Sequence, residues 1–235
     1  MVQREHTSSQ YDAELESVRE SVLLMGELVG RQVQLAIGTM GSNDRALMDR
    51  IIADDYRVNA MEVGIDENCT RIIACRQPTA GDLRMVMMII KTITDLERIG
   101  DEAKKIAITA RNLSQRKNLT LPRFEKVTCM TEMAQGMLHQ SLDAFTRLDI
   151  SAVSQVVHQD ALVDEEFRGI IRYLVTHMME DPRTISSALE ILFAAKSIER
   201  IGDHAKNMSE YVVYMIKGRD VRHITAEEIE RAVQQ

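Results

Sequence analysis

A nonapeptide that occurs twice constrains the fold of this chain more than any other feature of its sequence. It runs from Glu97 to Lys105 and again from Glu199 to Asn207, and seven of its nine positions are identical. The copies lie 102 residues apart in a chain of 235 residues, so the repeated unit is close to half of the chain. Because an internal repeat fixes an architecture, we expect one unit built twice, over residues 1–118 and 119–235.

The composition favours helices in both units. Apolar residues make up 45% of the chain, but only 4% of residues are aromatic, there is no Trp, and there are 15 Met. Cores of Leu, Ile, Val, Met and Ala suit helices better than sheets, in which aromatic and β-branched residues are enriched. Eleven Gly and three Pro are too few for the many tight turns of an all-β chain. We therefore expect an all-α fold.

Apolar residues recur at helical spacing in six long stretches. The segment 41–44 breaks the first two stretches apart, Pro78 and Pro182 open the third and sixth, and Gly218 ends the sixth. Short connections make consecutive helices antiparallel neighbours, which predicts two pseudo-symmetric three-helix bundles. The expected helices span residues 11–40, 44–73, 78–113, 122–148, 152–179 and 182–217, with a short one at 226–233.

Charge and hydropathy exclude several classes of function. A formal charge of −7 argues against nucleic acid as the main partner, since phosphate contacts need clustered Lys and Arg. The longest apolar runs fall far below the ~20 residues needed to span a bilayer, and the first eleven residues do not resemble a signal peptide. Three cysteines without metal-ligand spacing indicate reduced thiols. We expect a cytoplasmic protein that is not inserted in a membrane.

The repeated peptide carries two carboxylates one helical turn apart, and each preceding helix carries a second pair of oxygen-bearing side chains. Antiparallel packing brings the two pairs of each half level with one another. Such sets of oxygen ligands predict sites for a hard cation, namely magnesium, manganese, calcium or iron. The eight candidate metal ligands are Glu97, Asp101, Glu199, Asp203, Asp160, Asp164, Asp55 and Asn59.

A second interpretation of these residues stays open. Acidic pairs at this spacing are common on solvated helix faces, where Arg98, Arg200 or Lys105 would neutralise them. His204 replaces Glu102 in the second copy, and we expect it at the surface. Gly100 and Gly202 lie mid-helix, where glycine costs about 1 kcal/mol relative to alanine, so we expect each to allow a close helix contact.

Recognised catalytic patterns are missing from the sequence. No His has a Glu three residues before it, as ferritin-like metal sites require. There is also no Gly-rich phosphate loop, no G-x-S-x-G and no spaced Cys/His cluster. The paired carboxylates alone leave two alternatives, a metal-dependent hydrolase or oxidase of the bundle type, or a protein that stores metal or is held together by it.

The repeated E-R-I-G-D-x-A-K, with an oxygen-bearing pair upstream of each copy, resembles the PhoU family of phosphate-specific transport system accessory (regulatory) proteins. The resemblance covers essentially the whole chain. Asn59 departs from the family pattern, since an amide stands where a carboxylate is expected. Further matching segments are 60–67, 76–80, 173–183 and 197–200.

This resemblance implies two three-helix bundles, usually in a homodimer, and a cytoplasmic, non-enzymatic negative regulator of the phosphate regulon. It implies an adaptor between the ATPase subunit of a phosphate ABC transporter and a sensor histidine kinase, with no nucleic acid partner. It also implies metal binding through the E(D)-x-x-x-D pairs, which Glu97/Asp101, Asp160/Asp164 and Glu199/Asp203 match. The metal, whether magnesium, manganese, iron or zinc, stays open.

Overall fold

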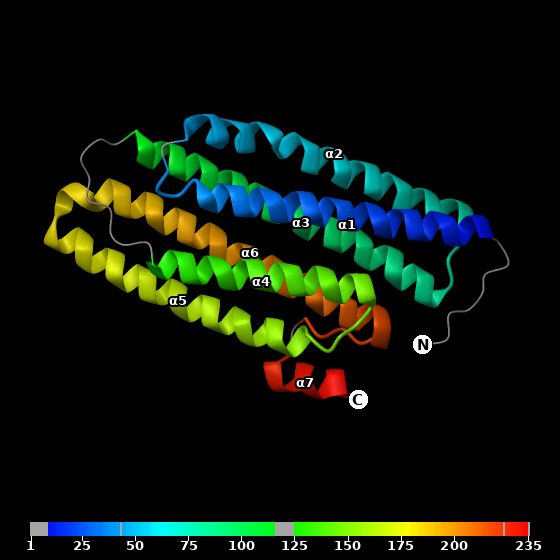
Figure 1. Cartoon of the computed structure of the whole chain (residues 1–235). Coiled ribbons are helices and arrows are strands. Elements are labelled where there is room, and N and C mark those ends of the chain that lie inside the picture. Colours follow the sequence, from blue (N-terminus) through cyan, green and yellow to red (C-terminus); the bar gives the residue numbers. More distant parts are fainter. Residues whose placement is uncertain (1–8, 43, 116–124, 223, 235) are drawn as a thin grey trace.

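The computed structural model describes residues 9–42, 44–115, 125–222 and 224–234. In these residues it contains helices and no strands, which confirms the expected all-α class (Figure 1). The expected domain boundary at 118/119 lies outside the described residues. The helices are α1 (Ser9–Gly38), α2 (Arg45–Arg76), α3 (Ala80–Ser114), α4 (Glu125–Arg147), α5 (Val153–Glu180), a 3-10 turn at Pro182–Thr184, α6 (Ile185–Lys217) and α7 (Ala226–Gln234).

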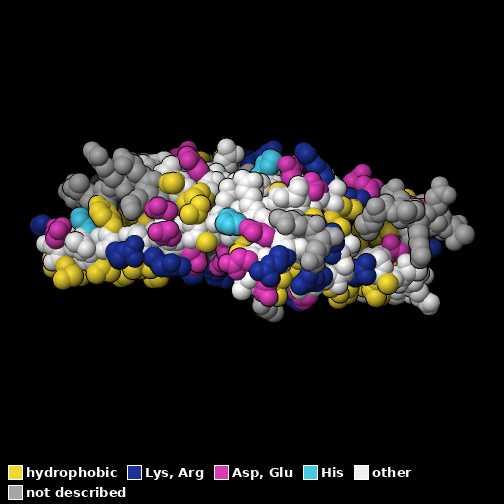
Figure 2. Space-filling model, turned by 90° about the horizontal axis from the view of Figure 1, so that it is seen from below, with side chains coloured by type: hydrophobic (Ala, Val, Ile, Leu, Met, Phe, Trp, Pro, Cys, Tyr) yellow, Lys and Arg dark blue, Asp and Glu magenta, His cyan; other side chains and the backbone are white. Residues whose placement is uncertain are grey.

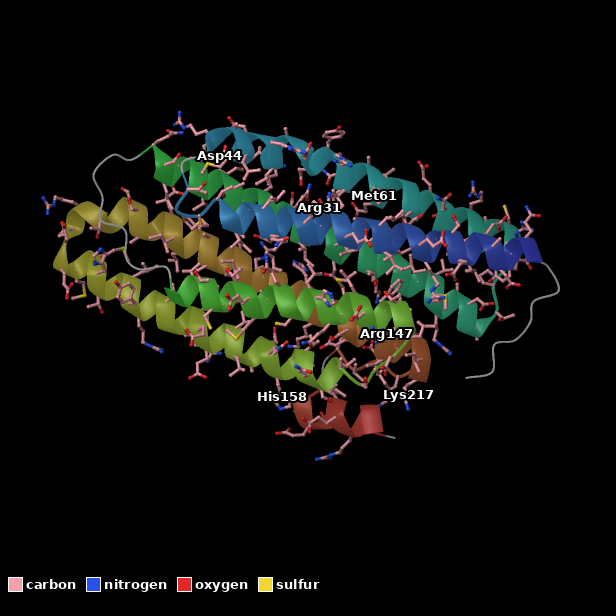
Figure 3. The ribbon with its side chains drawn as sticks, viewed as in Figure 1. Arg31, Asp44, Met61, Arg147, His158 and Lys217 are labelled. Atoms are coloured by element: carbon pink, nitrogen blue, oxygen red, sulfur yellow. The ribbon has the colours of Figure 1, made fainter. Side chains whose placement is uncertain are left out.

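Local sequence sets most of the helix ends. Asp44 caps α2 by accepting a hydrogen bond from the backbone N–H of Leu47, and it is labelled at the start of that helix in Figure 3. Gly218 ends α6 in the left-handed conformation, with φ of 69°, where glycine carries no steric cost. Pro78 lies outside α3, which begins at Ala80, because the chain stays extended at Thr79 before it turns into the helix.

The helices form two three-helix units, α1–α3 and α4–α6, that lie side by side along their length (Figure 1). Helices α3 and α6 make the central pair, and α1 also packs against α4. Helix α2 packs mainly against α1 and α3, while α5 packs mainly against α4 and α6. The repeated peptides therefore lie on the two helices at the centre of the molecule, and each faces the outer helix of its own unit.

One hydrophobic core runs through both units, because the same cluster of buried side chains joins α1–α3 to α4–α6. A smaller cluster seats α7 on α5 and includes Val153, Val213 and Ile229. Gly100 and Gly202 are buried and face Val58 and Met137, but a Cβ at either position would meet them only at 3.4–3.5 Å. The tightest approach lies at Gly26, which no periodicity indicated.

Candidate functional site

Four carboxylates lie close together between α2 and α3, and we call them the first acidic cluster: Asp55, Glu62, Glu97 and Asp101. Met61, labelled in Figure 3, marks their level on α2. The side chain of Glu97 keeps only 19% of its exposure. This burial, and then the charges of Asp101 and Glu62, raise the pKa of Glu97. The negative charge of the first acidic cluster is therefore not fully neutralised by the cations around Glu97.

Lys104 is the cation that hydrogen-bonds to the first acidic cluster. Its Nζ donates a hydrogen bond of 2.8 Å to Asp55 Oδ2, and this bond raises the pKa of Lys104. The other oxygen of that carboxylate, Oδ1, is buried and has no hydrogen-bond partner among the described residues. Buried acceptors are rarely left without a partner, so this oxygen is open to a donor or a cation.

The second acidic cluster consists of Asp160 and Asp164 on α5 with Glu199 and Asp203 on α6. Asp203 as a whole residue is exposed to solvent. Its carboxyl group is nevertheless partly desolvated, because it lies beside the packed helices. This desolvation, followed by repulsion from Glu199 and Asp160, raises the pKa of Asp203 to about 6. The second cluster is thus also short of positive charge around one of its carboxyl groups.

More cations reach the second acidic cluster than the first. Lys206 donates to Asp160 at 2.7 Å, and Lys196 donates to Glu199 Oε1 at 2.6 Å. The ammonium of Lys196 also lies 5.5 Å from the centre of the Phe167 ring. Arg168 approaches Asp164 at 3.5 Å at the exposed rim.

The structure gathers seven of the eight candidate ligands into these two clusters. The eighth, Asn59, is exposed on α2. Its place as a fourth oxygen-bearing group near Glu97 is taken by Glu62, one turn further along the same helix. Whether either cluster binds a metal stays a prediction.

Of the three cations that the second interpretation named, two hold another carboxylate, whereas Arg98 does pair with an acidic residue of the repeated peptide. Arg200 and Lys105 both bind the buried carboxylate of Glu102, at 2.7 and 2.9 Å. Arg98 lies nearest to Glu97, at 3.8 Å. The cations that hold Asp55 and Asp160 are Lys104 and Lys206. Both lysines stand at the eighth position of the repeated peptide, and their identity in the two copies was the signal available in the sequence.

His204 is also placed differently from the expectation of a surface residue. Its side chain is only 16% exposed, and its Nδ1 lies 2.7 Å from Asp95 Oδ1 across the α3–α6 contact. Asn207 donates to the same oxygen at 3.5 Å. His204 therefore joins the two units rather than either acidic cluster.

The donor set of both clusters suits a hard cation, since it consists of carboxylate oxygens. The orphaned Oδ1 of Asp55 and the raised pKa values of Glu97 and Asp203 indicate where positive charge is lacking. No three His, Cys, Asp or Glu side chains among the described residues are close enough to hold a metal ion as they stand. Binding therefore requires the carboxylates to turn toward one another.

Comparison with known proteins gives the family of this chain. The family model for the PhoU domain matches residues 22–110 and 127–212, one match in each half. The "Phosphate-specific transport system accessory protein PhoU" of Serratia marcescens is 50% identical over 226 residues, which is 96% of this chain and 92% of that protein. The protein of the same name from Escherichia coli (strain K12) is 49% identical over 227 residues, which is 96% of this chain and 93% of that protein.

Two crystal structures share the fold. That of PhoU from Pseudomonas aeruginosa has a TM-score of 0.85 at 44% identity and covers 89% of this chain and 100% of that one. That of the phosphate transport system regulatory protein PhoU from Streptococcus pneumoniae has a TM-score of 0.82 at 28% identity and covers 90% and 99%. In the part of this chain that the structure describes, every helix is too short or too polar to cross a membrane.

Proposed function

Because the chain belongs to the PhoU family, we propose that it is an accessory protein that regulates a phosphate transport system. The observation that carries this proposal is the extent of the similarity, since relatives named as accessory proteins of that system match 96% of the chain. Both halves of the repeat match the family separately, so the proposal does not rest on one shared module.

In this proposal the protein is a non-enzymatic, cytoplasmic homodimer that restrains the phosphate regulon. It contacts the ATPase subunit of the phosphate ABC transporter and a sensor histidine kinase. Transporter conformation then shifts the population of adaptor that inhibits the kinase, which requires only that the adaptor bind the transporter states unequally. Helices α1–α6 are long and lie lengthwise beside one another (Figure 1). Such an elongated molecule can offer separate faces to two partners.

The acidic clusters supply cation sites in the same proposal. Asp55, Glu62, Glu97 and Asp101 hold a cation in the first unit, and Asp160, Asp164, Glu199 and Asp203 hold one in the second. A bound magnesium, manganese or iron ion offsets the repulsion among the carboxylates and ties α2 to α3, or α5 to α6. Zinc fits less well, because zinc sites in proteins usually include nitrogen or sulfur ligands.

A reporter experiment tests the regulatory function. Cells that lack their own copy of this protein and carry a phosphate-regulon reporter are grown with excess phosphate, with and without the intact chain. We expect the intact chain to silence the reporter, and affinity capture from the same cells to retain the transporter ATPase subunit and the kinase. A reporter that stays active despite normal abundance of the chain would contradict the proposal.

Thermal melting tests the cation sites separately. Protein stripped with a chelator and then dialysed is melted with added Mg²⁺, Mn²⁺, Fe²⁺ or Zn²⁺. Ligand binding to the folded state raises the melting temperature, and we expect Glu97→Gln/Asp101→Asn and Glu199→Gln/Asp203→Asn each to reduce that rise. Glu16→Gln/Glu20→Gln is the matched control, since it removes an acidic pair of the same spacing from the exposed face of α1. An equal rise in all variants would exclude both clusters.

A further inference from the structure

A pocket of about 440 Å³ lies between the first turns of α3 and the end of α6, where the segment after Gly218 closes it. Lys217, labelled in Figure 3, marks this end of α6. The residues that line the pocket belong to neither acidic cluster, and no step proposed above uses it. Its volume falls in the range of ~300–1,000 Å³ that is usual for sites that bind small organic ligands.

Two cations face this pocket, and neither forms an ion pair with a described residue, although Asp220 lies near enough for its charge to act on Lys91. Arg84 makes no ion pair with a described residue, and its Nε is buried with no hydrogen-bond partner. Lys91 lies 5.7 Å from the centre of the Tyr211 ring and makes no ion pair with a described residue either. The two residues are seven apart on α3, so they line one helix face roughly 10 Å apart. A buried guanidinium nitrogen without an acceptor is a costly feature that an anionic ligand would remove.

The acidic groups of the pocket do not cancel these cations. Asp220 is held by Arg222, whose Nε donates to it at 2.9 Å. Glu210 is buried, and this burial raises its pKa to about 7, so near neutral pH it does not oppose an anion with a full charge. The remaining wall is apolar and aromatic and includes Met87, Met88 and Tyr214.

The repeat shows that the fold does not require this polar lining. Positions 102 residues from Arg84, Lys91 and Tyr214 in the other half hold Ser186, Phe193 and Asn112. Both helices expose apolar side chains at two of these equivalent positions, Leu83 and Met87 on α3 and Ile185 and Leu189 on α6, but α6 continues with exposed Phe193 where α3 has Lys91. Figure 2 shows exposed hydrophobic side chains along part of the lower edge of that view. The cations on α3 and the tyrosines on α6 therefore meet at only one of the two pseudo-equivalent contacts between these helices.

We propose that this pocket binds an organic phosphate, that is, a phosphate monoester with an apolar or aromatic body. A phosphate monoester carries close to two negative charges at neutral pH, which matches Arg84 and Lys91, and a guanidinium pairs with phosphate oxygens in a bidentate manner. The apolar wall takes the ester's organic part, which inorganic phosphate lacks. This assignment does not depend on the regulatory function proposed above.

Calorimetric titration of the purified full-length protein tests the assignment, with phenyl phosphate and adenosine monophosphate as probes. We expect saturable binding of at least one ester. Arg84→Gln and Lys91→Gln should each weaken it by about tenfold or more, because each removes a charge-assisted contact. Arg57→Gln, on the exposed face of α2, should leave it unchanged. Melting curves without ligand show that the variants fold.

Three results would overturn the proposal. Absence of saturable binding by both esters would remove the ligand class. Equal affinity for inorganic phosphate and for the esters would show that the apolar wall contributes nothing. Full affinity in folded Arg84→Gln and Lys91→Gln would place the binding elsewhere. None of these results bears on the reporter experiment, so the two proposals fail independently.

Discussion

The two acidic clusters occupy equivalent places in the repeat, yet different residues balance their charge. Both retain the lysine of the repeated peptide on the outer-helix aspartate, Lys104 on Asp55 and Lys206 on Asp160. Around this shared pair the halves diverge. The first has Glu62 where the second has Phe167, but Asn59 where the second has Asp164, so each cluster keeps four carboxylates. The first has Thr94 where the second has Lys196, so it has one cation fewer. The first cluster is therefore the more negative of the two.

This comparison distinguishes the residues that both halves of the fold share from the residues that set the charge of each cluster. The lysine–aspartate pair is repeated because it joins α2 to α3 and α5 to α6 beside the buried core. The flanking residues are not repeated, so they set the charge of each site without changing its frame. The arginines of the repeated peptide diverge in the same way, since Arg200 holds Glu102 across the α3–α6 contact while Arg98 stays at the surface.

The largest difference between equivalent residues is expected at these two arginines. Arg200→Met leaves Glu102, which is 2% exposed, with Lys105 alone, and this should lower the free energy of unfolding by about 2–3 kcal/mol. Arg98→Met should change it by less than about 0.5 kcal/mol, because exposed pairs contribute little. Urea unfolding measures both values. Equal losses would show that Glu102 does not depend on the second unit.

The two shared lysines should behave alike. Lys104→Met and Lys206→Met each leave a buried aspartate without its cation, which should cost about 2 kcal/mol of unfolding free energy in either case. The measurement is again chemical unfolding, in the absence of divalent cations. A difference of more than about 1 kcal/mol between the two variants would break the symmetry that the structure shows.

Asp203 should give the protein an unusual dependence on pH. Its pKa of about 6 in the folded chain is above the usual 3.8, so the folded chain keeps a proton that the unfolded chain has lost. Its contribution to stability therefore rises as the pH falls from above 6 toward 4, and it is unfavourable at pH 7 and above. Because the group is accessible to solvent, we expect Asp203→Asn to stabilise the cation-free protein by only about 1 kcal/mol at pH 7.5.

Melting curves between pH 4 and pH 8 check this prediction. The gain from Asp203→Asn should shrink toward zero at the acidic end, where the wild-type carboxyl group is protonated. Asp66→Asn, at an exposed position on α2, is the control. A gain that is independent of pH would show that the carboxyl group is not repelled by Glu199 and Asp160.

Lys196 gives the smallest of the expected effects and the most direct test of the charge difference. Lys196→Met removes the cation that distinguishes the second cluster, so the affinity of this cluster for Mn²⁺ should rise by about threefold to fivefold. The titration is done in a background of Glu97→Gln/Asp101→Asn, which leaves the second cluster as the remaining site. Unchanged or weaker binding would show that the lysine does not compete with the metal.

Much of the fold was predictable from the sequence because its signals are local. The repeat, the apolar periodicity and the breaks at Pro78 and Gly218 predicted helices that the structure confirms within a few residues. The acidic pairs were also recognisable, since i, i+4 spacing fixes one helix face. The contact between the two units is not encoded locally in the sequence. Glu102 and His204 find their ion-pair partners across that contact, so these partners could not be predicted. The pocket beside Arg84 depends in the same way on the chain beyond α6 returning to α3.

We propose that the carboxylates of the repeated peptide are required for regulation, and a reporter assay with cluster variants tests this in cells. Cells lacking their own copy, grown with excess phosphate, receive the intact chain, the fourfold variant Glu97→Gln/Asp101→Asn/Glu199→Gln/Asp203→Asn, or the control Glu16→Gln/Glu20→Gln. We predict that the intact chain and the control silence the phosphate-regulon reporter, whereas the fourfold variant at equal abundance leaves it active. Full silencing by the fourfold variant would contradict the claim.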